Sequence, residues 1–188
     1  MRRGNNIQLT LFDLEDMYPS YSIVISPPKK NIEDIALLKV VLHQKIGLSP
    51  INLKSIAHIS LLKLSCPDDD LFIINKVNRA ISYQHRFSIK LDGADIFNHN
   101  TSKTLFIKIN NPTPIATIHQ LILAQFNRRR KINPHLTIAR AIPNNDFKKI
   151  TLSAFDYHDE FFCDRITILK KPIDSIRYKI IYEAMLEE

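Results

Sequence analysis

Two short stretches of the sequence repeat one pattern, in which a histidine and a hydroxyl residue alternate with apolar residues. Ala57–Leu61 reads Ala-His-Ile-Ser-Leu, and Pro134–Ile138 reads Pro-His-Leu-Thr-Ile. Side chains alternate between the two faces of a β-strand, so each stretch places its imidazole and hydroxyl on one face and its aliphatic side chains on the other. A strand that buries its aliphatic face and presents an imidazole beside a hydroxyl suits an active site. Two such strands in one small chain are more informative than one.

The two motif strands belong to a repeating order of elements. Hydrophobic periodicity predicts strands at 21–26, 56–64, 86–91, 104–109, 135–141, 161–169 and 177–185, and helices at 32–46, 68–81, 114–126 and 146–155. Each half contains one motif strand, which predicts an α+β protein of two pseudo-symmetric lobes with mostly antiparallel sheets, outer helices and the motif strands facing a central cleft. No linker rich in Gly, Ser or Pro separates the halves, so we take 18–188 as a single bilobal domain and 1–17 as an N-terminal extension.

Composition narrows the functional classes. The chain has 188 residues and a net charge of +7 at pH 7, which suits a polyanionic partner such as RNA. Its three glycines form neither a Walker-type phosphate loop nor a dinucleotide-binding fingerprint. Cys66 and Cys163 form no CxxC pair and favour a reducing compartment. The apolar runs are too short for a signal peptide or a membrane span, so we expect no membrane association. With the reducing compartment this predicts a cytoplasmic protein, and we expect it to be a monomer.

The N-terminal extension contains a motif of its own. Gln8–Phe12 (Gln-Leu-Thr-Leu-Phe) resembles the short peptide with which bacterial proteins bind the replication sliding clamp. The same letters also form a good alternating strand. A clamp contact through Gln8–Phe12 and a structural strand are therefore both open interpretations.

Either histidine motif alone most often marks a solvated strand face, because patterns this short are weak evidence. The remaining histidines have no spacing that implies a metal site, and His43 and His119 fit helix faces. The basic run Arg128–Lys131 fits a solvated turn or, because it precedes the second motif, a surface that attracts RNA phosphates. Although a single histidine motif most often marks a solvated strand face, the two motifs taken together favour a functional site.

With its context, the doubled motif resembles the 2H phosphoesterases, and within them the group of 2′-5′ RNA ligases and RNA 2′,3′-cyclic phosphodiesterases. The similarity is carried by both motifs, an Ala-Arg pair after the second and a glycine-containing stretch before a strand: His58-Ile-Ser60-Leu, Pro134-His135-Leu-Thr137-Ile, Ala139-Arg140 and Asp92–Phe97. The two histidines lie 77 positions apart (135 minus 58), a usual spacing in that group. The likeness extends from Tyr21 to Tyr182, most of the chain.

The resemblance implies a metal-independent phosphodiesterase without a cofactor. It implies that His58 protonates the leaving O3′ while His135 activates water, so that an RNA 2′,3′-cyclic phosphate end becomes a 2′-phosphate. A pKa near neutrality lets one imidazole act as acid and the other as base. Ser60 and Thr137 would hold the phosphoryl oxygens. Ser60 departs from the commoner threonine but keeps the hydroxyl. The same site would also carry out reversible 2′-5′ RNA ligation.

Four further residues are candidates for substrate binding. Arg140 would add positive charge for the transition state. Its odd offset from His135 points it to the other strand face, unless the strand twists or bulges there. Arg130 and Lys131 belong to the basic run, and Tyr178 is a candidate for stacking on a base.

Two other functions are compatible with the sequence. A related enzyme would act on a small nucleotide, such as a cyclic phosphate of ADP-ribose or a 2′,5′-oligoadenylate. A non-catalytic RNA-binding module would also carry the motifs, although both pairs here keep the histidine and the hydroxyl. The expected partners are therefore RNA ends or small nucleotides, and a basic surface beyond the cleft would favour RNA.

Overall fold

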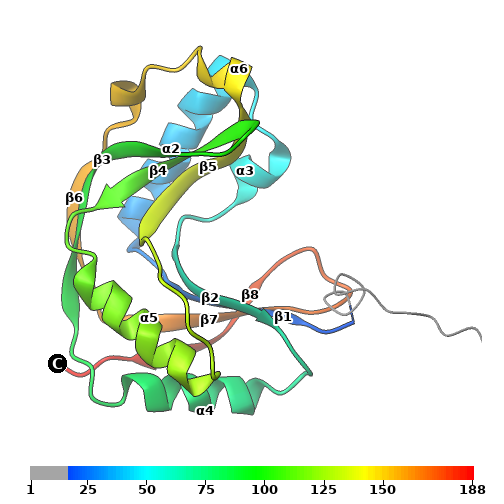
Figure 1. The fold of residues 1–188 in the computed structure, drawn as a ribbon, viewed down its shortest axis with the longest axis vertical. Helices are drawn as coiled ribbons and strands as arrows, with labels where there is room; N and C mark the ends of the chain where they lie inside the picture. Colours follow the sequence, from blue (N-terminus) through cyan, green and yellow to red (C-terminus); the bar gives the residue numbers. More distant parts are fainter. Residues whose placement is uncertain (1–16) are drawn as a thin grey trace, which may run out of the picture.

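The computed structural model describes residues 17–188, which form two four-stranded antiparallel sheets with helices packed against them (Figure 1). The strands are β1 (Ser20–Ile25), β2 (Ile59–Ser65), β3 (Phe87–Asn98), β4 (Ser102–Ile109), β5 (His135–Pro143), β6 (His158–Cys163), β7 (Arg165–Lys171) and β8 (Lys179–Met185). The helices are α2 (Lys29–Ile46), α3 (Pro50–Lys54), α4 (Asp70–Ile81), α5 (Thr113–Gln125), α6 (Asn144–Phe147) and the 3₁₀ helix η1 (Leu152–Phe155). The predicted α+β class with antiparallel sheets is confirmed.

The two lobes are not the two halves of the chain. The first sheet has the strand order β2-β1-β7-β8 and the second β5-β4-β3-β6, so the C-terminal strands complete the first sheet. The predicted single strand at 161–169 is wrong, because Cys163 ends β6 in one sheet and Arg165 begins β7 in the other. The chain crosses between the lobes at Asp164, whose carboxylate accepts a hydrogen bond from the Arg165 guanidinium (2.8 Å).

The helix ends follow local signals where those exist. Gly47 ends α2 in the left-handed conformation and donates its N–H to the His43 carbonyl (2.8 Å), as its position after an apolar stretch predicts. Asp69 caps α4 by accepting the N–H of Phe72 (2.9 Å). The predicted helix at 146–155 is wrong, since the chain forms the short α6 and η1 instead. The short α3 was not predicted, because five residues show no helical periodicity.

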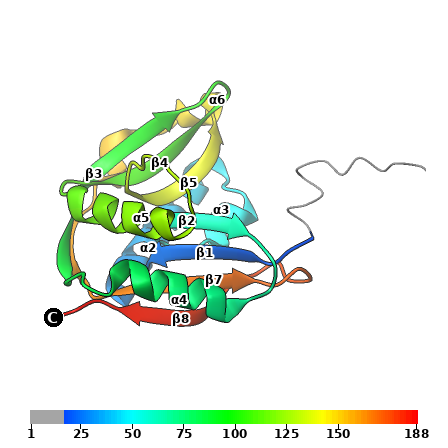
Figure 2. The same cartoon turned by 60° about the horizontal axis from the view of Figure 1, so that its bottom comes forward.

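The aliphatic faces of the motif strands are buried as their alternation predicts: Ile59, Leu61, Leu136 and Ile138. Helices α4 and α5 pack against each other and lie along the first sheet, whereas α2 and α3 pack against β5 (Figure 2). In residues 17–188, no helix is long and apolar enough to cross a membrane. The peptide Gln8–Phe12 lies outside the described residues, so its clamp contact stays a prediction.

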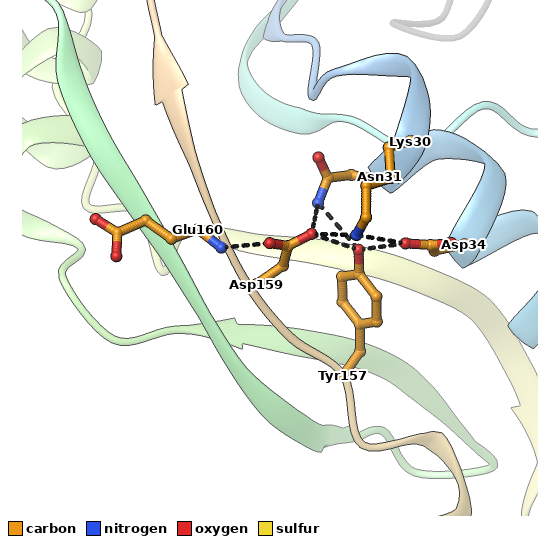
Figure 3. A network of polar contacts seen from close by, with 6 residues as sticks. All are labelled: Lys30, Asn31, Asp34, Tyr157, Asp159 and Glu160. Carbon is orange, nitrogen blue, oxygen red and sulfur yellow. Dashed lines mark hydrogen bonds and ion pairs between the residues drawn. The ribbon is translucent and has the colours of Figure 1, made fainter.

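Polar contacts fasten α2 to the second lobe (Figure 3). The buried Asn31 side chain donates to the Tyr157 hydroxyl (3.0 Å) and to Asp159 (2.9 Å). The Tyr157 hydroxyl donates to Asp34 (2.7 Å), and the Lys30 ammonium binds Asp159 (2.7 Å). The Lys30 hydrogen bond and a backbone N–H lower the pKa of Asp159 to about 2. This contact therefore stabilises the fold above about pH 4, and the contribution is lost as the pH falls towards 2.

Gly93 occupies a bulge in β3, where the register with β4 shifts between Leu91 and Ala94. Its φ is +74°, and an added Cβ would lie 3.2 Å from the Asp156 carboxylate oxygen that accepts the Ala94 N–H. We expect Gly93→Ala to lower the free energy of unfolding by about 2 kcal/mol, measured by urea denaturation. Gly47→Ala is the matched control, because its φ is also positive but nothing lies within 4 Å of the added Cβ. A loss no larger than in this control would contradict a tight contact at Gly93.

Candidate active site

The two motif histidines are anchored in the same way. His58 Nδ1 lies 2.8 Å from the Ile56 carbonyl oxygen, and His135 Nδ1 lies 2.8 Å from the Asn133 carbonyl oxygen. In both cases the acceptor belongs to the residue two positions earlier. A carbonyl oxygen only accepts, so each Nδ1 carries a hydrogen and each Nε2 is the atom that gains or loses a proton.

The motif strands bring these residues to one place. His58 immediately precedes β2 and His135 begins β5; these are edge strands of their sheets and lie against each other. Both imidazoles are half-buried, Thr137 is half-buried and Ser60 is exposed. Both hydroxyls belong to side chains that are at least partly exposed, where a ligand can reach them. We call His58, Ser60, His135 and Thr137 the histidine site.

Burial and nearby positive charge make both imidazoles less basic than usual. Burial lowers the pKa of His58, and the charges of Arg140, Lys39 and His135 lower it further, against the hydrogen bond to Ile56. Burial and the charge of Arg140 also lower the pKa of His135. Both histidines are therefore neutral at pH 7 in the free protein, and a bound anion would raise both pKa values.

A β-bulge in β5 explains how Arg140 escapes the strict alternation that would place it on the strand face opposite to His135. The register between β4 and β5 shifts twice, so that Thr137 pairs with Phe106 but Ile142 pairs with Lys103. These shifts place additional residues in β5, and Arg140 is exposed there. Its charge contributes to the lowered pKa of both histidines. The next residue, Ala141, has a φ of +53°, which is unusual for a residue with a Cβ, and it lies in the second of these register shifts.

Asn52, on helix α3 shortly before the first motif, holds this bulge of the second motif strand in place. Its Oδ1 accepts the Arg140 N–H (2.9 Å), and its Nδ2 donates to the Arg140 carbonyl (2.8 Å). The Asn52 amide thus makes the two backbone hydrogen bonds to Arg140 that a neighbouring strand would otherwise make. Because α3 leads into the segment that ends at His58, Asn52 joins the two motifs.

Two phenylalanines support the second imidazole. The rings of Phe97 and Phe106 are stacked with their centroids 4.1 Å apart. Both meet the His135 ring edge-on, at 4.9 Å and 5.1 Å. Such contacts favour this orientation of the imidazole. Phe106 is buried, so only Phe97, which is partly exposed, is open to a planar ligand group. Sequence reasoning found no aromatic partner here, since Phe97 and Phe106 lie on different strands.

The sequence model of the 2′-5′ RNA ligase superfamily matches residues 29–172, more than half of the chain. The chain belongs to the 2′-5′ RNA ligase superfamily. No curated protein has a significantly similar sequence. The fold is confirmed by solved structures of low sequence identity, which show that this chain shares their architecture.

Three of these structures illustrate the superfamily fold. TT0787 of Thermus thermophilus is 14% identical with a TM-score of 0.65, and the match covers 89% of this chain and 97% of that one. E. coli LigT in complex with ATP is 14% identical with a TM-score of 0.66, covering 91% and 99%. Kluyveromyces marxianus Usb1 with uridine monophosphate is 10% identical with a TM-score of 0.50, covering 91% and 100%.

The basic run of this superfamily member lies beside the helix that precedes the second motif. Arg128–Lys131 line a surface hollow of about 800 Å³ with the C-terminal part of α5. The buried His119 on α5 holds the run in place, because its Nδ1 meets the Leu61 carbonyl (2.8 Å) and its Nε2 the Arg130 carbonyl (3.0 Å). His119 is therefore not a surface residue, and it links β2 to the run before His135.

Tyr178 lies apart from the histidine site. Its hydroxyl is 2.9 Å from the Ser20 hydroxyl, at the start of β1. The other end of β1 pairs with the residue after His58, since Ile25 is opposite Ile59. Five strand residues separate the two positions, about 17 Å. A role for Tyr178 in substrate binding stays a prediction and would require a ligand that extends along the sheet.

Proposed function

We propose that this protein hydrolyses RNA 2′,3′-cyclic phosphate ends to 2′-phosphates without a metal, and that at the same site it reversibly joins such an end to a 5′-hydroxyl, which takes the place of water, in a 2′-5′ ligation. The matched anchoring of His58 and His135 supports this most strongly. Each imidazole directs one titratable Nε2 from its own sheet, and together they provide an acid and a base for one phosphorus. Membership of the superfamily supports phosphoryl-transfer chemistry of this kind.

In the proposed reaction, His135 Nε2 takes a proton from water while the water oxygen attacks phosphorus. The bond between phosphorus and O3′ breaks, and O3′ takes a proton from His58 Nε2, which leaves a 2′-phosphate. Ser60 and Thr137 donate hydrogen bonds to the non-bridging oxygens, and Arg140 stabilises their negative charge. The phosphate anion raises the lowered pKa values of the histidines, which allows one of them to hold the required proton on binding.

A small nucleotide is the alternative substrate. LigT has been solved with 3′-AMP and with ATP, and Usb1 with uridine monophosphate, so proteins of this fold bind single nucleotides. The ring of Phe97, which is partly exposed, would suit a nucleobase in either case. The cations that line the hollow beside α5 favour RNA, because a mononucleotide at the histidine site would not need them.

A substrate panel tests the proposal. We expect kcat/KM for a short oligoribonucleotide ending in a 2′,3′-cyclic phosphate to exceed that for 2′,3′-cyclic AMP, for ADP-ribose cyclic phosphate and for a 2′,5′-oligoadenylate. Joining of a 2′,3′-cyclic phosphate end to a 5′-hydroxyl end would establish the ligation. A preference for a small nucleotide would identify that nucleotide, and not RNA, as the substrate. Binding of RNA without turnover of any tested substrate would favour the non-catalytic alternative.

The basic run allows a further prediction. We expect the double variant Arg130→Ala/Lys131→Ala to lower kcat/KM for the oligoribonucleotide about tenfold at low salt, and to reduce its salt dependence, because two phosphate contacts are lost. Turnover of 2′,3′-cyclic AMP should be unchanged. The control is Lys45→Ala/Lys148→Ala, which removes the same charge from exposed positions elsewhere. Equal losses for both substrates would contradict an RNA-binding role for the run.

A further inference from the structure

Lys39 on α2 is an unusual residue. Among the described residues it is the only buried lysine or arginine, with 2% of its surface exposed. Its ammonium donates to the Ser55 carbonyl and to the Ser55 hydroxyl (2.7 Å), which are neutral oxygens. Within residues 17–188 no carboxylate lies at ion-pair distance from it. A buried charge without a counter-charge is destabilising, so its presence in this position requires an explanation.

The contacts of Lys39 lead directly to the histidine site. The Ser55 hydroxyl that accepts from Lys39 donates to the Asn52 carbonyl (2.8 Å), and Asn52 holds the bulge in β5. The residue after Ser55 is Ile56, whose carbonyl receives the His58 Nδ1 hydrogen (2.8 Å). Ser55 lies between Asn52, which holds the bulge, and Ile56, which orients His58. Lys39 thus fixes the middle of this segment.

The charge of Lys39 is also part of the site. Burial and, to a smaller extent, the charge of Arg140 together lower the pKa of Lys39 to about 8. Lys39, Arg140 and His135 all lower the pKa of His58. The cations Lys39 and Arg140 therefore act on one another at pH 7, and the described residues give Lys39 no carboxylate at ion-pair distance to balance its charge. An arrangement of this kind attracts an anion and is most stable when one is bound.

We propose that Lys39 is a positioning residue of the histidine site: it fixes the segment that orients His58, and its buried charge is balanced only when a phosphate anion occupies the site. The inference rests on the proposed function, because it takes the histidine site to be where the phosphate binds. Lys39 acts through Ser55 and through its charge, and it does not touch the reacting atoms. It also gives α2, which packs on the second lobe, a direct influence on the first motif.

Binding of inorganic phosphate tests this without any turnover. In calorimetric titration at pH 7, we expect Lys39→Met to bind phosphate about tenfold more weakly than the wild-type protein, because one nearby positive charge is lost. Lys45→Met is the matched control, since it removes the same charge from an exposed position of the same helix and should leave the affinity unchanged. Lys39→Arg, which keeps the charge, should recover most of the affinity.

A merely structural lysine would not alter the titration of His58. We expect NMR of the imidazole nitrogens to show a higher pKa of His58 in Lys39→Met than in the wild type or Lys45→Met. If Lys39→Met does not fold, the wild type alone is informative, because Lys39 loses its charge above pH 8. Phosphate affinity should then fall between pH 7 and 9, although phosphate itself becomes more negative over that range.

The outcomes separate this inference from the proposed function. Phosphate affinity and His58 titration that are unchanged in Lys39→Met, or a wild-type protein that does not bind phosphate, would overturn the role of Lys39. Phosphate binding with the expected Lys39 effect, in a protein that hydrolyses no cyclic phosphate, would support Lys39 and reject the proposed function.

Discussion

His58→Ala and His135→Ala should each lower kcat for a 2′,3′-cyclic phosphate end about 10³-fold. Each variant removes a proton-transfer group from the same transition state, and general acid–base catalysis of this kind contributes about 10²–10⁴-fold. The double variant should be little slower than the slower single variant, because the acid contributes little to the rate once the base has been removed, and the base contributes little without the acid. Single-turnover hydrolysis of a labelled oligoribonucleotide would give these rates.

The pH dependence gives the same prediction an independent readout. Burial and the charge of Arg140 lower the pKa of both histidines, so the acid limb of kcat/KM should lie below about pH 6.5. His43→Ala is the control, since His43 is exposed on α2 and remote in sequence from both motifs. A rate reduced equally by His43→Ala, or full activity in either motif variant, would contradict the paired mechanism.

Arg140→Met should lower kcat/KM about 100-fold, which corresponds to about 2.7 kcal/mol of transition-state stabilisation. The bulge in β5 exposes Arg140, and its charge acts on both imidazoles. Removing this charge should therefore also raise the pKa of both histidines and move the acid limb of the pH profile to higher pH. Methionine keeps most of the side-chain length, so packing at the bulge should change little.

Lys148→Met is the matched control for Arg140→Met, because it removes one positive charge from an exposed position after α6. The small substrate 2′,3′-cyclic AMP suits this comparison better than the oligoribonucleotide, since it does not extend to the basic run. A pH profile that does not move in Arg140→Met would mean that its charge does not act on the histidines, whatever happens to the rate.

Local patterns predicted the features that depend on local geometry. The strand period places His58 with Ser60 and His135 with Thr137, and the aliphatic residues between them are buried as expected. Gly47 ends a helix because few other residues adopt its conformation easily. Strand parity also required a twist or bulge for Arg140 to reach the face of the histidines, and β5 contains a bulge.

Contacts between distant residues left no such signal. Asn52 and Arg140 are 88 positions apart, and nothing in either neighbourhood indicates that one pairs with the backbone of the other. Lys39 reads as a polar helix residue because its burial depends on β5 and the Ser55 segment. The stretch around Asp164 contains no glycine or proline, so it reads as one strand although its two parts belong to different sheets.

Hydrolysis in ¹⁸O-labelled water with EDTA present tests the central claim most directly. The substrate is a short RNA ending in a 2′,3′-cyclic phosphate, and the product is analysed by mass spectrometry and by comparison with 2′- and 3′-phosphate standards. We expect turnover that resists EDTA and yields a 2′-phosphate with one ¹⁸O atom, lost in His58→Ala and in His135→Ala. A 3′-phosphate product would contradict the expulsion of O3′, and dependence on a metal or turnover that survives both substitutions would contradict the two-histidine mechanism.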